Sequence, residues 1–224
     1  HLEQVIPLLK EFNVNIAVIT NSSLLWREDV RCALHAADWV SVKIDALSHD
    51  VWRKIDRPHG RLQLDKILQG VSDFAHAFGG ELTTETMLVN GINDAPEEAE
   101  RIAAFTADLR PKTSYLALPT RPPAEQWVRP ASEQALNNAY QIFHEHALTV
   151  EYLIGYEGNA FAFTGDVEAD LLSITSVHPM RADAVRKLLT KAHADWPVVE
   201  KLLQQKQLLE LRYGDNTFYM RKLL

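Results

Sequence analysis

Apolar and polar residues alternate strictly over residues 39–46, which read Trp-Val-Ser-Val-Lys-Ile-Asp-Ala. A period of two is typical of a β-strand whose two faces meet different surroundings. One face carries Val40, Val42, Ile44 and Ala46, and the other carries Ser41, Lys43 and Asp45. Helical patterns flank the strand over residues 29–37 and 62–78, so it belongs to a β/α repeat, whose strands are normally covered on both faces.

Lys43 and Asp45 are unusual residues for a strand of this kind. Burying either charge without compensation costs on the order of several kcal/mol. Two interpretations explain why the chain keeps both: they hold a polar ligand, or they form a structural ion pair. Of the two, the pattern favours a ligand site.

The rest of the pattern predicts strands and helices in alternation. Further strands are expected at residues 14–20, 82–89, 113–118 and 150–154, and further helices at 2–12, 96–109 and 132–146. We expect Asp94 to cap the helix at 96–109. At least four β/α units with short loops predict an α/β fold with a parallel barrel or a doubly wound sheet. Because four strands cannot close an eight-stranded barrel, we expect either a partial barrel or further strands upstream.

Candidate site residues lie where these strands end. Asn21-Ser22-Ser23 follows the strand at 14–20, at the end where barrel folds place their ligand loops. Turn chemistry explains the same three residues equally well, because Asn and Ser favour turns. The sequence contains neither a dinucleotide-binding glycine fingerprint nor a P-loop.

The tail of the chain follows a different pattern. Residues 167–174, 181–192 and 197–205 read as three short helices, and residues 208–213 and 217–221 read as strands joined by a turn. Three helices followed by a β-hairpin predict a winged helix-turn-helix over residues 166–224. Residues 178–224 hold 9 Lys and Arg against 5 Asp and Glu, whereas the whole chain has a net charge of −7. This module is expected either to contact nucleic acid or to cap the barrel and dock a protein.

Composition sets broad limits on the class of protein. The chain has 224 residues, of which 46% are hydrophobic, and no apolar run approaches the ~18 residues needed to cross a membrane. Cys32 is the single cysteine and lies in a helical pattern, which predicts a buried, inert thiol and a reducing, cytoplasmic location. The sequence begins at His1 and immediately enters a helix, so we expect a further segment upstream.

Six motifs in order resemble the radical SAM superfamily. They are residues 18–25 (Val-Ile-Thr-Asn-Ser-Ser-Leu-Leu), 37–46, 57–59 (Arg-Pro-His), 86–94 (Thr-Met-Leu-Val-Asn-Gly-Ile-Asn-Asp), 121–128 (Arg-Pro-Pro-Ala-Glu-Gln-Trp-Val) and 176–181 (Ser-Val-His-Pro-Met-Arg). The last two are similar to the cytoplasmic group labelled Fe-S oxidoreductases, relatives of the archaeal tRNA wyosine-base synthases.

This resemblance implies a partial (β/α)6 barrel, of which residues 1–160 would form strands three to six, about four of the six. It also implies S-adenosylmethionine (SAM) and a [4Fe–4S] cluster as cofactors, and an unknown substrate, with tRNA as a candidate. The family's Cys-x3-Cys-x2-Cys loop is absent here, and one cysteine cannot hold such a cluster. These 224 residues alone are therefore expected to carry no iron and not to cleave SAM.

The resemblance also assigns roles to individual residues. SAM would be held by residues at the ends of the four strands: Thr20, Asn21, Ser22, Lys43, Asp45, Glu85, Met87, Asn90 and Leu118. The substrate side would be formed by His59, Arg121 and Glu125.

Two other functions remain open from the residues themselves. Lys43, at a strand end, could form a Schiff base in an aldolase if burial depressed its pKa. A clusterless barrel with a winged helix could instead be a nucleic-acid or protein binding module, because fold alone does not settle function.

Overall fold

The computed structural model describes residues 2–154, 161–177 and 179–222. The chain divides into two compact units. The first comprises residues 1–119 and 127–154, and the second comprises residues 120–126 and 155–224. We describe each unit by itself.

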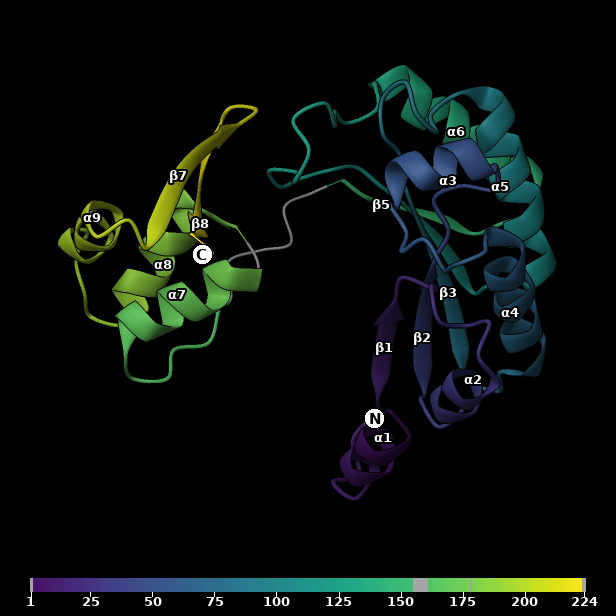
Figure 1. The fold of residues 1–224 in the computed structure, drawn as a ribbon, viewed down its shortest axis with the longest axis horizontal. Helices are drawn as coiled ribbons and strands as arrows, with labels where there is room; N and C mark the ends of the chain where they lie inside the picture. Colours follow the sequence, from purple (N-terminus) through teal and green to yellow (C-terminus); the bar gives the residue numbers. More distant parts are fainter. Residues whose placement is uncertain (1, 155–160, 178, 223–224) are drawn as a thin grey trace. The chain divides into compact units, whose positions relative to one another are not determined.

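The first unit is built on a five-stranded parallel sheet with the order β1-β2-β3-β4-β5 (Figure 1). Its strands are β1 (Ala17–Thr20), β2 (Trp39–Lys43), β3 (Glu81–Met87), β4 (Thr113–Ala117) and β5 (Val150–Leu153). Strand order that follows the chain without reversal is typical of a barrel wall and not of a doubly wound sheet. All five strands predicted from the pattern are present, so the count of about four implied by the resemblance is one too low.

The helices of this unit are α1 (Leu2–Lys10), α2 (Glu28–Leu34), α3 (His49–Ile55), α4 (Leu64–Ala77), α5 (Pro96–Leu109) and α6 (Glu133–Glu145). Figure 1 shows α2, α4, α5 and α6 on the same side of the sheet. The core lies between these helices and the sheet, where Val40, Val42 and Leu116 are fully buried together with Phe74 and Phe143. The predicted alternation in β2 is therefore confirmed: its apolar face packs on the helices, and its polar face is free to form a site.

Helix α4 approaches the chain after β1 so closely that one position must be glycine. A Cβ atom added to Gly70 would lie 2.2 Å from the carbonyl oxygen of Leu25, an atom of the backbone. Glycine inside a helix costs ~1 kcal/mol relative to alanine, so it is kept here for the contact.

We predict that Gly70→Ala lowers the free energy of unfolding by about 2–3 kcal/mol, because overpacking against backbone outweighs the gain in helix propensity. Gly60→Ala is the matched control, since a Cβ there meets nothing within 4 Å. Denaturant unfolding of both variants measures the difference, and a Gly70→Ala variant as stable as Gly60→Ala would contradict the close approach.

Helix α3 was not expected from the sequence, and it forms one wall of the site described below. Its first turn is held by Glu98 from the start of α5, whose buried carboxylate accepts hydrogen bonds from the backbone N–H groups of Leu47 and Ser48 at 3.0 and 3.4 Å. Burial acts to raise the pKa of Glu98, but the hydrogen bonds from Arg101 and from these two amides outweigh it and lower the pKa. A short helix fixed by a carboxylate 43 or more residues away leaves no periodic signal in the sequence.

Two smaller expectations are wrong. Cys32 is exposed, because the apolar stripe of α2 runs through Val30, Ala33 and Leu34 and leaves position 32 on the outer face. Asp94 does not cap α5; Ala95 occupies the cap position, and the Asp94 carboxylate accepts instead from the N–H of Gly91 at 2.8 Å.

The second unit contains α7 (Val167–Val177), β6 (Met180–Arg181), α8 (Ala182–Lys191), α9 (Pro197–Gln204), β7 (Leu208–Tyr213) and β8 (Asn216–Arg221). Its sheet is antiparallel with the order β6-β8-β7, and the two-residue strand β6 was not expected. Buried Leu171, Met180, Leu188 and Leu202 form the core. The sequence also predicts a glycine-containing turn at residues 155–158, which lies outside the described residues. In the part of the chain described here, no helix is long and apolar enough to cross a membrane.

Candidate functional site

The polar face of β2 forms a charged cluster with β3. The ammonium of Lys43 lies 3.2 Å from Oδ2 of Asp45 and 3.1 Å from Oε1 of Glu85. The parallel register places Lys43 directly beside Glu85, so the two side chains project from the same face of the sheet. The ion pair of Lys43 and Asp45, one of the two interpretations of the sequence, is present, and Glu85 joins it.

This cluster belongs to a polar row that crosses four strands. Glu85 is paired in register with Tyr115 of β4, and Tyr115 is paired with Glu151 of β5. Side chains paired in a parallel register share a face, so Lys43, Glu85, Tyr115 and Glu151 line one face of the sheet near its carboxyl end. In α/β sheets of this kind, that end is where ligands bind.

Asp45 also has a structural task. Its Oδ1 accepts a hydrogen bond from the N–H of Met87 at 2.8 Å, and its backbone oxygen accepts from the side chain of Asn93 at 2.8 Å. The same Asn93 amide donates to the Met87 oxygen and accepts from the Val89 N–H, each at 2.8 Å. Asn93 is fully buried and joins the ends of β2 and β3.

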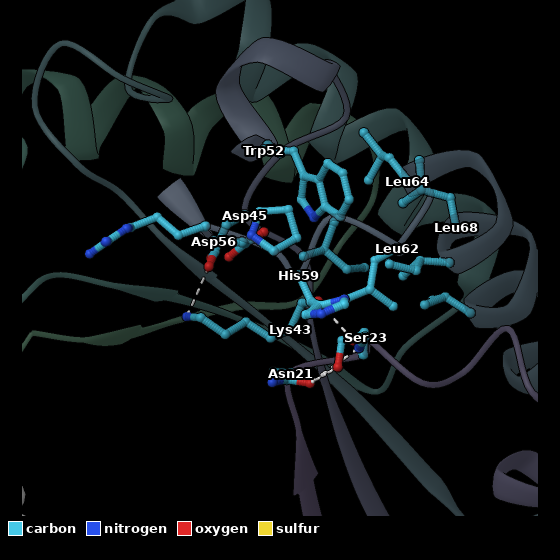
Figure 2. Close-up of a pocket in the computed structure, with 17 residues that line it drawn as sticks. Asn21, Ser23, Lys43, Asp45, Trp52, Asp56, His59, Leu62, Leu64 and Leu68 are labelled. Carbon is cyan, nitrogen blue, oxygen red and sulfur yellow. Dashed lines mark hydrogen bonds and ion pairs between the residues drawn. The ribbon is translucent and has the colours of Figure 1, made fainter. Parts of the chain in front are cut away.

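A pocket of about 350 Å³ opens beside the cluster, at the carboxyl ends of β1 and β2. Figure 2 shows its polar residues Lys43, Asp45 and Asp56 apart from a wall of leucines, with Trp52 of α3 above them. Its lining consists of Asn21, Ser22, Ser23, Lys43, Ile44, Asp45, Ala46, Trp52, Asp56, Arg57, Pro58, His59, Leu62, Leu64, Ile67, Leu68 and Val71. The pocket therefore joins a charged floor to an apolar wall supplied by α4.

Asp56 ends α3 and brings a second carboxyl group to Asp45. Asp56 is an exposed residue, but its side chain lines the pocket together with Asp45, whose carboxyl group contributes to its pKa. Burial, followed by repulsion from the charge of Asp45, raises the pKa of Asp56 to about 7. Burial also raises the pKa of Asp45, which Lys43 and the Met87 N–H oppose. Both shifts act against the simultaneous ionisation of the two carboxyl groups.

The ammonium of Lys43 remains charged. Burial acts to lower its pKa, but the attraction of Asp45 and then of Glu85 outweighs burial and raises the pKa of Lys43. The depressed pKa on which the aldolase alternative depended is therefore wrong, because two carboxylates flank the amine.

The turn after β1 uses its polar groups locally. The Asn21 side-chain oxygen accepts from the N–H and hydroxyl of Ser23 at 3.1 and 2.7 Å, and Thr20 Oγ1 accepts from the N–H of Ser22. Ser22 has a φ of 64° and donates its hydroxyl to the Lys43 carbonyl oxygen at 2.9 Å. Turn chemistry thus accounts for these contacts, although Asn21 and Ser22 also line the pocket.

The other expected site residues are dispersed. His59 lines the pocket, whereas Asn90 is exposed beyond β3 and Leu118 directly follows β4. Arg121 and Glu125 fall in the segment 120–126, which groups with the second unit. The structure brings Lys43, Asp45, Glu85 and His59 to one region, with Met87 beside them through its backbone.

Sequence reasoning missed Trp52, Asp56 and Asn93. Asn93 lies within the motif at 86–94, and Asp56 directly precedes the motif at 57–59, so a signal for their region existed. Trp52 lies on the helix that was not predicted.

The residues of this chain do not fit an iron–sulfur cluster. A [4Fe–4S] cluster requires three or four thiolates, and the chain has one cysteine, Cys32, on the outer face of α2. Among the described residues, no group of three or more His, Cys, Asp and Glu side chains is arranged to hold a metal ion.

Comparison with known proteins places this fold. The sequence matches no family model. The chain is similar in structure to a domain of pyruvate-formate lyase-activating enzyme from Bacteroides vulgatus, with a TM-score of 0.56 and 20% identity over 70% of this chain and 92% of that one. It is also similar to a radical SAM methyltransferase from Sphaerobacter thermophilus, with a TM-score of 0.51 and 19% identity over 66% of this chain and 43% of that one. The α/β fold is thus that of radical SAM domains.

Sequence comparison identifies the family. The chain is 39% identical over 225 residues to a UPF0026 protein of Methanocaldococcus jannaschii, a match that covers 100% of this chain and 70% of that protein. It belongs to the UPF0026 family. A shorter match, 30% identical over 87 residues, covers 38% of this chain and 23% of a probable dual-specificity RNA methyltransferase RlmN of Streptococcus agalactiae.

We predict that Asn93→Ala lowers the free energy of unfolding by about 3 kcal/mol, because buried backbone groups of Asp45, Met87 and Val89 lose their partners. Asn90→Ala, three residues earlier and exposed, should change it by less than ~0.5 kcal/mol. Denaturant unfolding compares the two, and equal stabilities would mean that Asn93 does not hold the strand ends together.

Proposed function

We propose that this chain is the SAM-binding part of a radical SAM enzyme. The observation that carries the proposal is the cluster of Lys43, Asp45 and Glu85 at the carboxyl end of β2 and β3. The methionyl end of SAM bears a carboxylate and an ammonium side by side. A cation flanked by two anions, on one face of a sheet, matches that pattern with charge-assisted hydrogen bonds.

Each residue has a defined task in this proposal. Lys43 pairs with the SAM carboxylate, and Glu85 accepts from its ammonium or from ribose hydroxyls. Asp45 keeps Lys43 oriented while its other oxygen holds Met87, so the cation is positioned before the ligand arrives. Preorganisation of this kind reduces the cost of binding.

A [4Fe–4S] cluster, where a radical SAM enzyme holds one, would supply the electron for reductive cleavage of SAM. The thiolates for it would have to come from outside these 224 residues, which hold one cysteine. We therefore assign to this chain the binding and orientation of SAM and the exclusion of water. We also expect the protein to work in the cytoplasm.

Lys43→Ala should weaken SAM binding by about tenfold or more, because the lost charge-assisted hydrogen bond is worth ~1.5–3 kcal/mol. Lys112→Ala is the matched control, since Lys112 also pairs with a strand glutamate, Glu81, at the opposite end of β3. Calorimetric titration of SAM into the chain measures both. Glu85→Gln provides a second test if Lys43→Ala is unstable, and unchanged affinity in both site variants would refute this assignment.

For the second unit, we propose a winged helix that contacts RNA. Its order of elements, α7-β6-α8-α9-β7-β8, and its sheet order β6-β8-β7 support a winged helix. The net positive charge of residues 178–224 and the similarity to an RNA methyltransferase over 87 residues support RNA as the partner. Helix α9 is poorly suited to contact base edges, because the ammonium of its Lys201 is paired with the carboxylate of Glu168 at 2.7 Å. Contact through phosphates is therefore the better interpretation.

We expect tRNA to bind the chain at about 50 mM salt and much more weakly at about 200 mM, because each phosphate contact releases counterions. Replacing exposed Arg212 and Arg221 of the hairpin by alanine should reduce the salt slope by about two. Lys10→Ala in the first unit, where Lys10 pairs with Asp38, is the control. Absence of binding at low salt would favour a structural cap or a protein-docking module.

A further inference from the structure

The SAM proposal leaves half of the pocket without a role. The lining residues without a role are Asp56 beside Asp45, and Trp52 and His59 with Leu62 and Leu68 of the apolar wall. Figure 2 shows Trp52 and the leucines on the side of the pocket away from Lys43. Asp45 lies at the boundary, because it pairs with Lys43 on one side and with Asp56 on the other.

We propose that this half of the pocket binds the base of a nucleoside or nucleotide substrate, with the ring against Trp52 and the leucine wall and its hydrogen-bonding edge on the Asp45–Asp56 pair. The inference names a substrate class for the proposed enzyme and in that sense rests on the proposed function.

The size and walls of the pocket favour one planar ring system. A volume of about 350 Å³ is at the lower end of the range of small-molecule sites, ~300–1,000 Å³. Trp52 is 7% exposed and contacts His49 edge-on at 6.4 Å, so its ring is held in place. Proteins that take up an unpaired base place it between aromatic and apolar side chains in this way.

The two carboxyl groups supply the edge contacts. Burial raises the pKa of Asp45, but Lys43 and the Met87 N–H hold its two oxygens and favour its ionised form. Among the described residues Asp56 has no such donors, so of the two carboxyl groups it is the one assigned the proton. One carboxylate and one protonated carboxyl present an acceptor beside a donor. Bases present the complement, an N–H group beside a ring nitrogen or carbonyl oxygen. An entering base therefore replaces the hydrogen bond between the two carboxyls with two of its own.

A carboxyl pair of this kind makes binding depend on pH. The charged groups around Asp56 are Lys43 at the end of β2, Asp45 two residues later, Glu85 on β3, and Arg57 and His59 in the loop that follows α3. Above pH 7, Asp56 loses its proton and can no longer donate to the base. With a pKa of about 7, the protonated fraction falls about tenfold between pH 6 and pH 8, and affinity should fall with it.

The test uses cytidine as the probe and N4,N4-dimethylcytidine as its matched control, which keeps the ring but lacks the N–H donor. The indole N–H signal of Trp52, assigned with Trp52→Phe, reports binding by NMR. Cytidine should bind with a Kd of about 1 mM at pH 6, as expected of a fragment, and the dimethyl analogue at least about tenfold more weakly.

Three variants separate a role in binding from a role in folding. Asp56→Ala should lose the preference for cytidine over the dimethyl analogue. Asp56→Asn keeps a donor at the same place, so it should still bind cytidine but lose the pH dependence of binding. Loss of the pH dependence in this variant would also show that His59 is not the source of that dependence. Asp50→Ala, exposed in the first turn of α3 and outside the pocket lining, should behave as the unmodified chain.

Equal binding of the two probes, or an unchanged pH profile in Asp56→Asn, overturns the inference. Competition between SAM and cytidine would show that the adenine of the cofactor fills this half, which also overturns the assignment to a substrate; simultaneous binding supports it. The two proposals fail separately. Loss of cytidine discrimination with intact SAM binding removes only the base pocket, whereas cytidine binding without SAM binding removes the proposed cofactor.

Discussion

The site depends on how the chain joins β2 to β3 beyond the last ladder hydrogen bond. There, the Asp45 carboxylate takes the N–H of Met87, and the Asn93 side chain bonds the carbonyls of Asp45 and Met87 and the N–H of Val89. Side chains thus continue the sheet where the backbones separate. These hydrogen bonds hold Asp45 in place, and Asp45 in turn holds Lys43 through their ion pair. The polar side of the pocket is therefore rigid.

Much of the architecture could be predicted because apolar and polar residues repeat along the chain with the short periods of strands and helices. The alternation in residues 39–46 and the helical stripes around it arise from burial on one face, which a sequence displays directly. Helix α5 and strand β7 begin and end where the pattern places them, at Pro96–Leu109 and Leu208–Tyr213. The charges of Lys43 and Asp45 stood out for the same reason, since they break the apolar rule for strands of this class.

The unpredicted features depend on partners distant in sequence. Helix α3 is held by Glu98, and the need for glycine at position 70 comes from the carbonyl of Leu25. The raised pKa of Asp56 comes from burial in the folded chain and then from Asp45, eleven residues earlier. Burial alone would lower the pKa of Lys43, but its two carboxylate neighbours raise it. Such pairings are set by the fold, so they could not be read from local patterns.

The exposed position of Cys32 gives this protein a chemical handle. The chain contains one thiol, and it lies on the outer face of α2, a helix that packs on the side of the sheet away from the polar row. A spin label or fluorophore attached there would occupy a unique, defined place without removal of other cysteines. With a second cysteine introduced into the second unit, the distance between the two units could then be measured in solution.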